Sequence, residues 1–463
     1  MKKTVYTLLA ALALSSCNYL DIEPVGQVIP GSVSEYRALL TEAYGTAYPA
    51  ANSHSYTCLL SDEVGSLDRN SYTGFITPSD GEEASYNFRW EYSSGNMREY
   101  PWLYYYRTIF LANAVIEGIG DAAQDTNSEN KDQLLGEAYA LRAYCHFELV
   151  NLYGKWYDPA TADTDRGVPL ALYNDIEQSY KPDSVARVYR QILDDLETAA
   201  DHMQVEVQPS TDYSYRFSKK VLTAFEARVR LYMGQWQEAY DKATSLLASC
   251  PLQDMNETEA QEYAEDERLP WLPTSPENIL ALDRPFGGFG GDITYGAVLS
   301  DPILEKFDRD NDRRWKFISE SFDLETFLTV YKIKRSMNTR TSIRSAEMYL
   351  IAAEAAAHLD GKLDEAKGYF SSLQAKRFTP DGAAAKAAEV EGLDQTRLLA
   401  EIADERAREF LMEGHRWLDL RRTTRPQITK EYEGQTYVLQ ANDPRYTLPY
   451  PQSAIENNPD LNN

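Results

Sequence analysis

The stretch DERAREFLMEGHRWLDLRR, residues Asp404 to Arg422, carries acidic and basic side chains at intervals of three or four residues. That interval brings side chains together on one side of an α-helix. The charged residues in this register are Glu405, Arg406, Glu409, Glu413, Arg416 and Asp419. We interpret them as ion pairs on the helix surface and between helices, which lock a helical scaffold.

Helical periodicity extends to two segments upstream. In the first, apolar side chains recur at Leu134, Ala138, Leu141, Cys145, Leu149 and Leu152. In the second, they recur at Val185, Val188, Ile192, Leu196 and Ala199, and Asp183 and Ser184 are the candidate N-caps. Each pattern predicts a helix with one buried apolar stripe. We expect the two helices to pack together.

Two later segments share a spacing that indicates paired helices. Gly234 and Gly361 each end a predicted helix, and an apolar residue, Trp236 or Leu363, follows two positions later. Alanine stands five positions after each glycine. This pattern is typical of the tetratricopeptide (TPR) helix-turn-helix, in which glycine forms a left-handed cap and alanine lets helices cross closely. The predicted fold class is therefore all-α, with TPR-like stacked helical hairpins.

Long stretches without helical period separate these helices. Residues 53–102 are rich in Ser, Gly, Asn and aromatic residues, and residues 251–300 are rich in Pro and Gly. Loops of this length in a compact protein are usually functional or disordered, and their aromatic content favours order. We expect these irregular loops to form a ligand-binding face.

The beginning of the chain predicts export. Lys2 and Lys3 precede an apolar run of about ten residues, about half of what a membrane-spanning helix needs, which is typical of a signal peptide. We therefore assign residues 1–16 to a signal peptide.

Cys17 follows Leu14, Ser15 and Ser16, an order that resembles the lipobox of bacterial lipoproteins. By that resemblance, Cys17 becomes a lipidated N-terminus, and residues 17–30 form the tether. Ordinary cleavage that leaves a free thiol is the alternative. Asp21 and Glu23 resemble the signal that sends Bacteroidetes lipoproteins to the outer face, or they belong to a solvated tether.

The composition limits the classes of function. The chain has 463 residues and a formal net charge of −26, which would repel a phosphate backbone, so nucleic-acid binding is not expected. Its 33 tyrosines offer flat faces with a polar tip, which suit sugars and peptides as well as packing. Cys58, Cys145 and Cys250 are widely separated, which predicts neither a disulfide framework nor a zinc site. We expect Cys145 to be a buried thiol.

The sequence contains no complete motif for calcium binding, for a zinc protease or for a serine hydrolase. GGFGGD, Gly287 to Asp292, fits the start of a calcium-binding nonapeptide repeat, but such a roll needs a tandem array. The histidines form no H-E-x-x-H pair, and no G-x-S-x-G occurs. Neither a metal site nor a cofactor is predicted.

The C-terminal stretch and the closing segment RYTLPYPQSAIENNPDLNN resemble the SusD/RagB-like family, outer-membrane lipoproteins of Bacteroidetes that capture nutrients. The matching residues are Glu405, Arg406, Glu409, Glu413, Gly414, Arg416, Asp419, Leu420, Arg421, Arg422, Leu448, Pro449, Pro451, Ile455, Glu456, Asn458 and Pro459. WLYYYRTIFLANAVIEGI, EAYALRAYCHFELVNLYG and SAEMYLIAAEAAAHLDG resemble further family blocks in the same order. The resemblance covers essentially the whole chain.

This resemblance implies a single SusD-like domain over residues 31–463. Residues 31–250 would hold helical pairs and the ligand loop 53–102, and residues 251–463 the ligand loop 251–300 and the final TPR-like pair. The family implies capture of oligosaccharides without catalysis, on the extracellular side of the outer membrane. The protein would be held there by its lipid anchor alone, and would deliver the ligand to a TonB-dependent, SusC-like transporter.

Family members place ligand contacts in loops that correspond to these two segments. The candidates here, which match no fixed family motif, are Arg69, Asn70, Tyr72, Phe75, Trp90 and Tyr92 in the first loop, and Trp271, Phe286, Phe289 and Tyr295 in the second. Aromatic rings would stack on sugar faces, while Arg and Asn would bind hydroxyl groups. The alternative role is to fill small hydrophobic clusters beneath the loops.

No catalytic residue is expected, because glycosidic cleavage needs two carboxylates across a cleft, about 5 to 10 Å apart, and helical spacing does not predict that. Three further alternatives stay open: the same architecture could capture peptides, it could be a TPR-like scaffold for other proteins, or it could be an enzyme, which would need a perturbed carboxylate or a nucleophile that faces a cleft.

Overall fold

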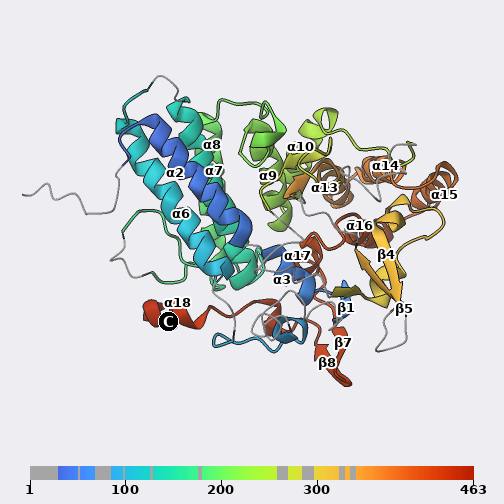
Figure 1. Ribbon diagram of the computed structural model, residues 1–463. Coiled ribbons are helices and arrows are strands. Elements are labelled where there is room, and N and C mark those ends of the chain that lie inside the picture. The colour runs from blue at the N-terminus through green and yellow to red at the C-terminus, as the bar shows by residue number, and fades with distance from the viewer. Residues whose placement is uncertain are drawn as a thin grey trace, which may run out of the picture.

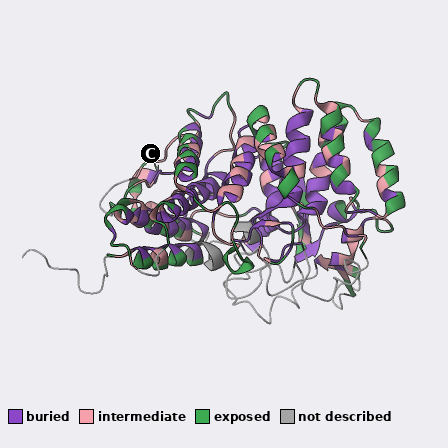
Figure 2. Cartoon of the chain, turned by 90° about the horizontal axis from the view of Figure 1, so that it is seen from above, coloured by how far each residue is buried: buried purple, intermediate pink, exposed green. Residues whose placement is uncertain are grey.

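The computed structural model describes residues 30–50, 53–67, 85–96, 100–125, 129–175, 180–257, 270–283, 297–322, 329–333 and 340–462. Within these residues the fold is mostly helical, and its strands form small two-stranded ladders (Figure 1). The predicted fold class is confirmed, with the ladders as an addition. Figure 2 shows buried residues on the helix sides that face one another and exposed residues on the outer sides.

The N-terminal half forms a helical bundle. Its long helices are α2 (Val33–Ala50), α6 (Tyr100–Gly118), α7 (Lys131–Tyr153) and α8 (Val185–His202). Helix α8 packs against α7 as predicted, and of the two candidate N-caps Ser184 is the one that accepts a hydrogen bond, from the Arg187 backbone N–H. Helix α7 is buried on nearly every side rather than along one stripe. This is possible because Arg142 pairs with Asp195 of α8 at 2.6 Å, so that no charge is buried alone.

Two helical hairpins follow, α9 (Lys219–Tyr232) with α10 (Trp236–Leu246), and α13 (Ser345–Ala357) with α14 (Leu363–Gln374). Gly234 and Gly361 have φ of +69° and +76°, the left-handed conformation that a glycine cap adopts without strain. Ala239 and Ala366 are fully buried. Because α10 also packs against α13, the two hairpins stack as the TPR-like pattern predicts.

The remaining helices close the C-terminal half. They are α15 (Pro380–Glu391), α16 (Gln395–Glu409), α17 (His415–Arg422) and α18 (Gln452–Asn457), with the short α3 (Ser53–Leu60) and α12 (Asp301–Leu304). Single 3₁₀ turns are η1 (Ile119–Asp121), η2 (Thr211–Tyr213), η3 (Leu247–Ser249), η5 (Arg313–Phe317), η6 (Pro444–Tyr446) and η7 (Pro459–Asn462).

The strands pair antiparallel in four ladders within the described residues. The ladders are β1 (Val64–Leu67) with β3 (Ala297–Leu299), β2 (Asn278–Leu280) with β6 (Ile343–Arg344), β4 (Ile318–Phe322) with β5 (Thr329–Ile333), and β7 (Ile428–Tyr432) with β8 (Gln435–Leu439). Strands β1 and β3 approach each other closely, since a Cβ added at Gly65 would lie 2.8 Å from the Ser300 Cα. Glycine is therefore required at this position.

A cluster of buried charges ties the two ends of the chain's C-terminal half together. Glu409, at the end of α16, accepts hydrogen bonds from Arg314, Arg344 and Arg377 at 2.8 to 2.9 Å. Glu277 also pairs with Arg344 and Arg377. The predicted ion pairing between helices is confirmed, as for Arg406 of α16 with Asp419 of α17, but the charged residues are buried and do not lie on a helix surface. The main partners come from distant segments, and together they satisfy one another in the core.

Cys58, Cys145 and Cys250 are buried free thiols, which confirms the prediction for Cys145. Burial raises the pKa of Cys58 and of Cys145 well above the usual thiol value. Such thiols are unreactive in the folded protein.

Candidate binding cavity

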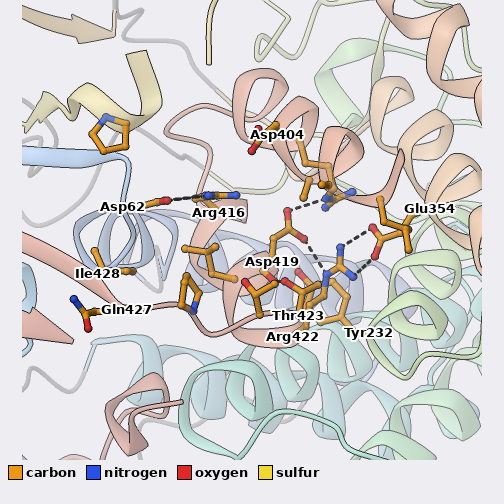
Figure 3. A pocket seen from close by; sticks show the side chains of 18 of the residues that line it. Asp62, Tyr232, Glu354, Asp404, Arg416, Asp419, Arg422, Thr423, Gln427 and Ile428 are labelled. Carbon is orange, nitrogen blue, oxygen red and sulfur yellow. Dashed lines mark hydrogen bonds and ion pairs between the residues drawn. The ribbon is translucent and has the colours of Figure 1, made fainter. Parts of the chain in front are cut away.

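A cavity of about 1180 Å³ opens where the TPR-like hairpins meet the last helices and strands (Figure 3). Its lining comes from the α9–α10 turn, the end of α13, helix α16, and the segment from α17 into β7. The start of β1 and residues 300–302 after β3 complete it. Segments far apart in sequence thus form one concave surface, the usual setting of a ligand site.

Paired charges form one side of the cavity. Arg416 binds both carboxylate oxygens of Asp62 at 2.8 Å. Asp419 accepts from Arg406 at 2.7 Å and from Arg422 at 2.9 Å, and Figure 3 shows Asp419 beside Arg422. Because Asp419 neutralises part of each guanidinium charge, the arrangement holds α17 against α16 without an isolated ion.

The carboxylates of Asp419 and Glu354 stay ionised. Burial alone would raise the pKa of Asp419, but Arg406 and Arg422 outweigh it and lower that pKa below its usual value. Glu354 behaves in the same way, since Arg422 binds both of its oxygens at 2.6 and 2.8 Å and lowers its pKa despite burial. A general acid would need the opposite shift. The charged side of the cavity is therefore suited to structure and hydrogen bonding.

Arg406 has hydrogen-bonding capacity left over. Its Nε donates to Asp419, but its buried Nη1 and Nη2 have no hydrogen-bond partner among the described residues. Unsatisfied buried donors are costly.

The other side of the cavity offers rings and neutral polar groups. The half-buried Trp236 stacks on His358 with ring centroids 3.9 Å apart, and burial lowers the pKa of His358, which keeps that ring neutral at neutral pH. Thr423 and Gln427 expose a hydroxyl and an amide at the rim. Flat rings next to hydroxyl and amide groups suit an uncharged, hydroxylated ligand.

Lys430 lies at the edge of the cavity with its ammonium enclosed by protein. Its Nζ lies 4.5 Å from the Phe88 ring centroid and 4.7 Å from the Trp90 ring centroid, and it donates to the Leu59 carbonyl at 2.6 Å. Burial lowers its pKa to about 7. Close to Lys430, burial raises the pKa of Glu63 to about 8, although the Met412 N–H donates a hydrogen bond to the Glu63 carboxyl group at 2.8 Å.

The β1–β3 ladder links the cavity to both predicted ligand loops. Leu67, the last residue of β1, pairs with Ala297, the first residue of β3. The ladder therefore pairs residues 64–67 of the predicted loop 53–102 with residues 297–299 of the predicted loop 251–300. At the opposite end of the ladder, Val64 and Ser300 line the cavity.

Only three of the predicted ligand contacts lie in the described residues. Trp90 and Trp271 are buried, at 1% and 3% exposure. The Trp90 indole N–H donates to the Leu60 carbonyl at 2.9 Å, and the Trp271 ring packs edge-on against Phe317. Because protein covers their rings, both tryptophans fill hydrophobic clusters, which is the alternative role given above for these residues. Tyr92 is half-buried and donates to the Arg445 carbonyl.

The other predicted residues lie outside the described residues. They are Cys17, Arg69, Asn70, Tyr72, Phe75, Phe286, Phe289 and Tyr295. Sequence reasoning placed Trp236 in a helical hairpin but did not predict that it lines a cavity. It also did not predict that the segment which follows α17 and enters β7 lines the same cavity. That segment, Thr423 to Glu431, carries no motif that could have revealed it.

The described residues were also compared with what a metal site and a membrane-spanning helix require, and they meet neither requirement. No group of His, Cys, Asp and Glu there could hold a metal ion. None of the helices in the same ranges combines the length and the apolar character that crossing a membrane requires.

Comparisons with known families cover most of the chain. Residues 18–231 match a family model described as "Starch-binding associating with outer membrane", and residues 305–463 match the model of the SusD family. SusD-like protein P2 of Formosa agariphila is 25% identical over 91% of this chain and 91% of the relative. SusD-like protein P38 of the same organism is 36% identical, but that match spans 32% of this chain and 26% of the relative.

Solved structures share the fold. A SusD superfamily protein from Bacteroides thetaiotaomicron superposes with a TM-score of 0.75 at 21% identity, covering 93% of this chain and 99% of that one. A laminarin-binding SusD-like protein superposes with a TM-score of 0.60 at 19% identity, over 92% and 98% of the two chains.

Proposed function

This chain belongs to the SusD/RagB-like family, and we propose that it captures neutral oligosaccharides without converting them. The observation that carries the proposal is the cavity of about 1180 Å³, whose lining places the stacked rings of Trp236 and His358 together with the polar residues Thr423 and Gln427. The ligand bound by the laminarin-binding relative is of the same chemical class.

The cavity's charges support a neutral ligand. Its arginines are paired with carboxylates, and Asp301, Asp404 and Glu431 add further acidic groups to the lining. An acidic sugar would meet negative potential both here and across a chain of net charge −26. Hydroxyl groups of a neutral sugar would find acceptors in these carboxylates and a donor in the Gln427 amide.

The same charges support the proposal of binding without turnover. Hydrolysis of a glycosidic bond needs one carboxyl group with a raised pKa to protonate the leaving group. In the cavity, Glu354 and Asp419 have lowered pKa values because arginines hold their ionised forms. We therefore assign them to holding the fold and to accepting hydrogen bonds.

We further propose that Cys17 carries the lipid anchor and that the protein faces outward, where it delivers its ligand to a TonB-dependent, SusC-like transporter. The family description, which refers to association with the outer membrane, supports this placement. A Cys17→Ala variant should appear in the soluble fraction, whereas the parent protein should co-sediment with outer membranes and be digested by external protease. Equal fractionation of the two proteins would contradict the anchor.

Isothermal titration with neutral oligosaccharides, uronate oligosaccharides and peptides tests the ligand class. Trp236→Ala should weaken binding of neutral sugars about tenfold or more, because it removes a large ring from the cavity. The matched control is Trp315→Ala, which removes a half-buried tryptophan outside the cavity lining. Strong peptide binding without a response to any sugar would favour the peptide-capturing alternative and overturn the proposal.

A further inference from the structure

A second groove lies on the N-terminal bundle, away from the cavity. It has a volume of about 390 Å³ and is formed by one face of α6, residues 169–175, Tyr180, and the C-terminal residues of α18 and η7. Figure 1 shows α18 and the C-terminus beside the bundle end of the molecule. The groove shares no lining residue with the large cavity.

Exposed apolar side chains gather at this groove. Leu103 and Phe110 of α6 are 48% and 46% exposed, and Tyr173 opposite them is 67% exposed. Leu103 and Phe110 stand seven residues apart and so project from one face of the helix. Among the described residues only six large hydrophobic side chains are exposed, and three of them are here. Such a concentration marks a binding surface.

The walls of the groove are fixed by hydrogen bonds. Asn113 of α6 donates to the Ala171 carbonyl at 3.1 Å and accepts from Arg142 at 3.0 Å. Tyr106 donates to the Pro169 carbonyl at 2.8 Å, which holds the same segment against α6. The groove is therefore preformed, and binding would cost little ordering of this wall.

The C-terminal wall is anchored in the same manner. The Asn458 side-chain amide donates to the Tyr180 carbonyl at 2.5 Å. The Tyr450 hydroxyl, just upstream, donates to the Gly167 carbonyl at 2.6 Å. Both contacts tie the end of the chain to the segment that carries Tyr173.

The chemistry of the lining selects one class of occupant. No lysine, arginine or histidine is among the described residues that line the groove, so nothing there would neutralise a phosphate or a carboxylate. Ser453 and Asn457 place a hydroxyl and an amide beside the rings. An apolar protein segment would cover these polar groups without pairing them, at a cost in free energy. A sugar offers both apolar C–H faces and hydroxyl groups.

We propose that this groove is a second site for a neutral saccharide, which holds another part of the polymer captured at the cavity. This proposal takes the ligand class, a neutral saccharide, from the proposed function. What is new is the second binding site. Two linked sites on one molecule raise the apparent affinity for a long chain by about 10²–10⁴-fold when both can be occupied. Short oligosaccharides would gain nothing from this effect.

The test compares a long and a short form of one glycan. Affinity electrophoresis in polysaccharide gels measures the long form, and isothermal titration measures the matching oligosaccharide. The double variant Phe110→Ala, Tyr173→Ala should lose at least about tenfold in affinity for the polysaccharide. Its affinity for the short oligosaccharide at the cavity should stay within about twofold of the parent protein. Tyr213→Ala, another exposed tyrosine at 40% exposure, is the control and should change neither.

The outcomes separate this proposal from the proposed function. If the double variant matches the parent in both assays while Trp236→Ala loses binding, the second site is overturned and capture at the cavity stands. If the double variant keeps polysaccharide affinity but no longer co-purifies with an outer-membrane transporter, the groove is a protein-docking surface, which also overturns the proposal. If the parent binds no saccharide, both proposals fall together. Residual polysaccharide binding by Trp236→Ala that disappears in the triple variant supports the second site directly.

Discussion

Replacing Glu409 by glutamine should strongly destabilise the protein. The Glu409 carboxylate accepts four hydrogen bonds from three guanidinium groups, those of Arg314, Arg344 and Arg377, and its side chain is 1% exposed. Removing its charge leaves these buried guanidinium groups short of a counter-charge. Breaking a buried ion pair in this way costs about 3–5 kcal/mol, a large part of the 5–15 kcal/mol that typically stabilises a folded protein.

Urea unfolding followed by far-UV circular dichroism measures the effect as a lower midpoint at unchanged slope. The control is Glu389→Gln, which removes a carboxylate that is 64% exposed and pairs with Lys386 on the surface of α15. That change should cost no more than about 1 kcal/mol. Equal losses in the two variants, or a loss below about 1 kcal/mol in Glu409→Gln, would refute the view that this cluster holds the C-terminal half together.

The cluster also predicts acid sensitivity. Burial alone would raise the pKa of Glu405, but Arg314 and Arg408 outweigh it and lower that pKa to about 2. In the unfolded chain this carboxyl group has a pKa near 4.5. Because its pKa is lower in the folded protein, the group stabilises the fold at any pH above 4.5, and this stabilisation is lost as the pH falls toward 2. The unfolding midpoint in urea should therefore drop steeply over this range.

Three further predictions concern the binding region and the thiols. Burial raises the pKa of Glu63 to about 8, so between about pH 4.5 and pH 8 this group is protonated in the folded protein and ionised in the unfolded chain, and its contribution to stability falls as the pH rises. Glu63→Gln removes this titration, so urea titrations should show the variant gaining stability relative to the parent from pH 5 to pH 8. A difference in stability that does not change with pH would contradict this. Gly65→Ala should lower the free energy of unfolding by roughly 1–3 kcal/mol and weaken sugar binding, because the new Cβ would lie 2.8 Å from the Ser300 Cα. Unchanged urea unfolding and unchanged sugar titration would show that the ladder tolerates the side chain. Cys58, Cys145 and Cys250 should react with a thiol reagent only after unfolding, because all three are buried; rapid labelling of the native protein would argue against that burial.

Features set by local sequence could be predicted. The glycine caps at 234 and 361 follow from a few neighbouring residues, and both have the expected positive φ. The apolar repeat of 185–199 gave helix α8 and its Ser184 cap. In each case helical periodicity or cap chemistry acts within one or two turns, so no knowledge of the tertiary fold was needed.

Features set by distant contacts could not be predicted. The charges of Glu409 suggested neighbours three or four residues away, but its partners Arg314, Arg344 and Arg377 lie on other segments. Strands β1 and β3 have four and three residues, too few for a reliable alternating pattern.

The site was the hardest part to foresee. The type of a residue does not reveal whether its ring is covered, so Trp90 and Trp271 looked as suitable for stacking as an exposed tryptophan would. The cavity itself depends on how several elements from distant parts of the sequence meet. Its polar rim at Thr423 and Gln427 has no pattern that distinguishes it from an ordinary connection.

The most direct test of capture without conversion is a single titration of the purified protein with a panel of neutral oligosaccharides, followed by chromatography of the recovered sugar. We expect saturable heat for at least one member of the panel and its quantitative recovery at the original chain length. Absence of binding across the whole panel, or release of shorter products, would contradict the account.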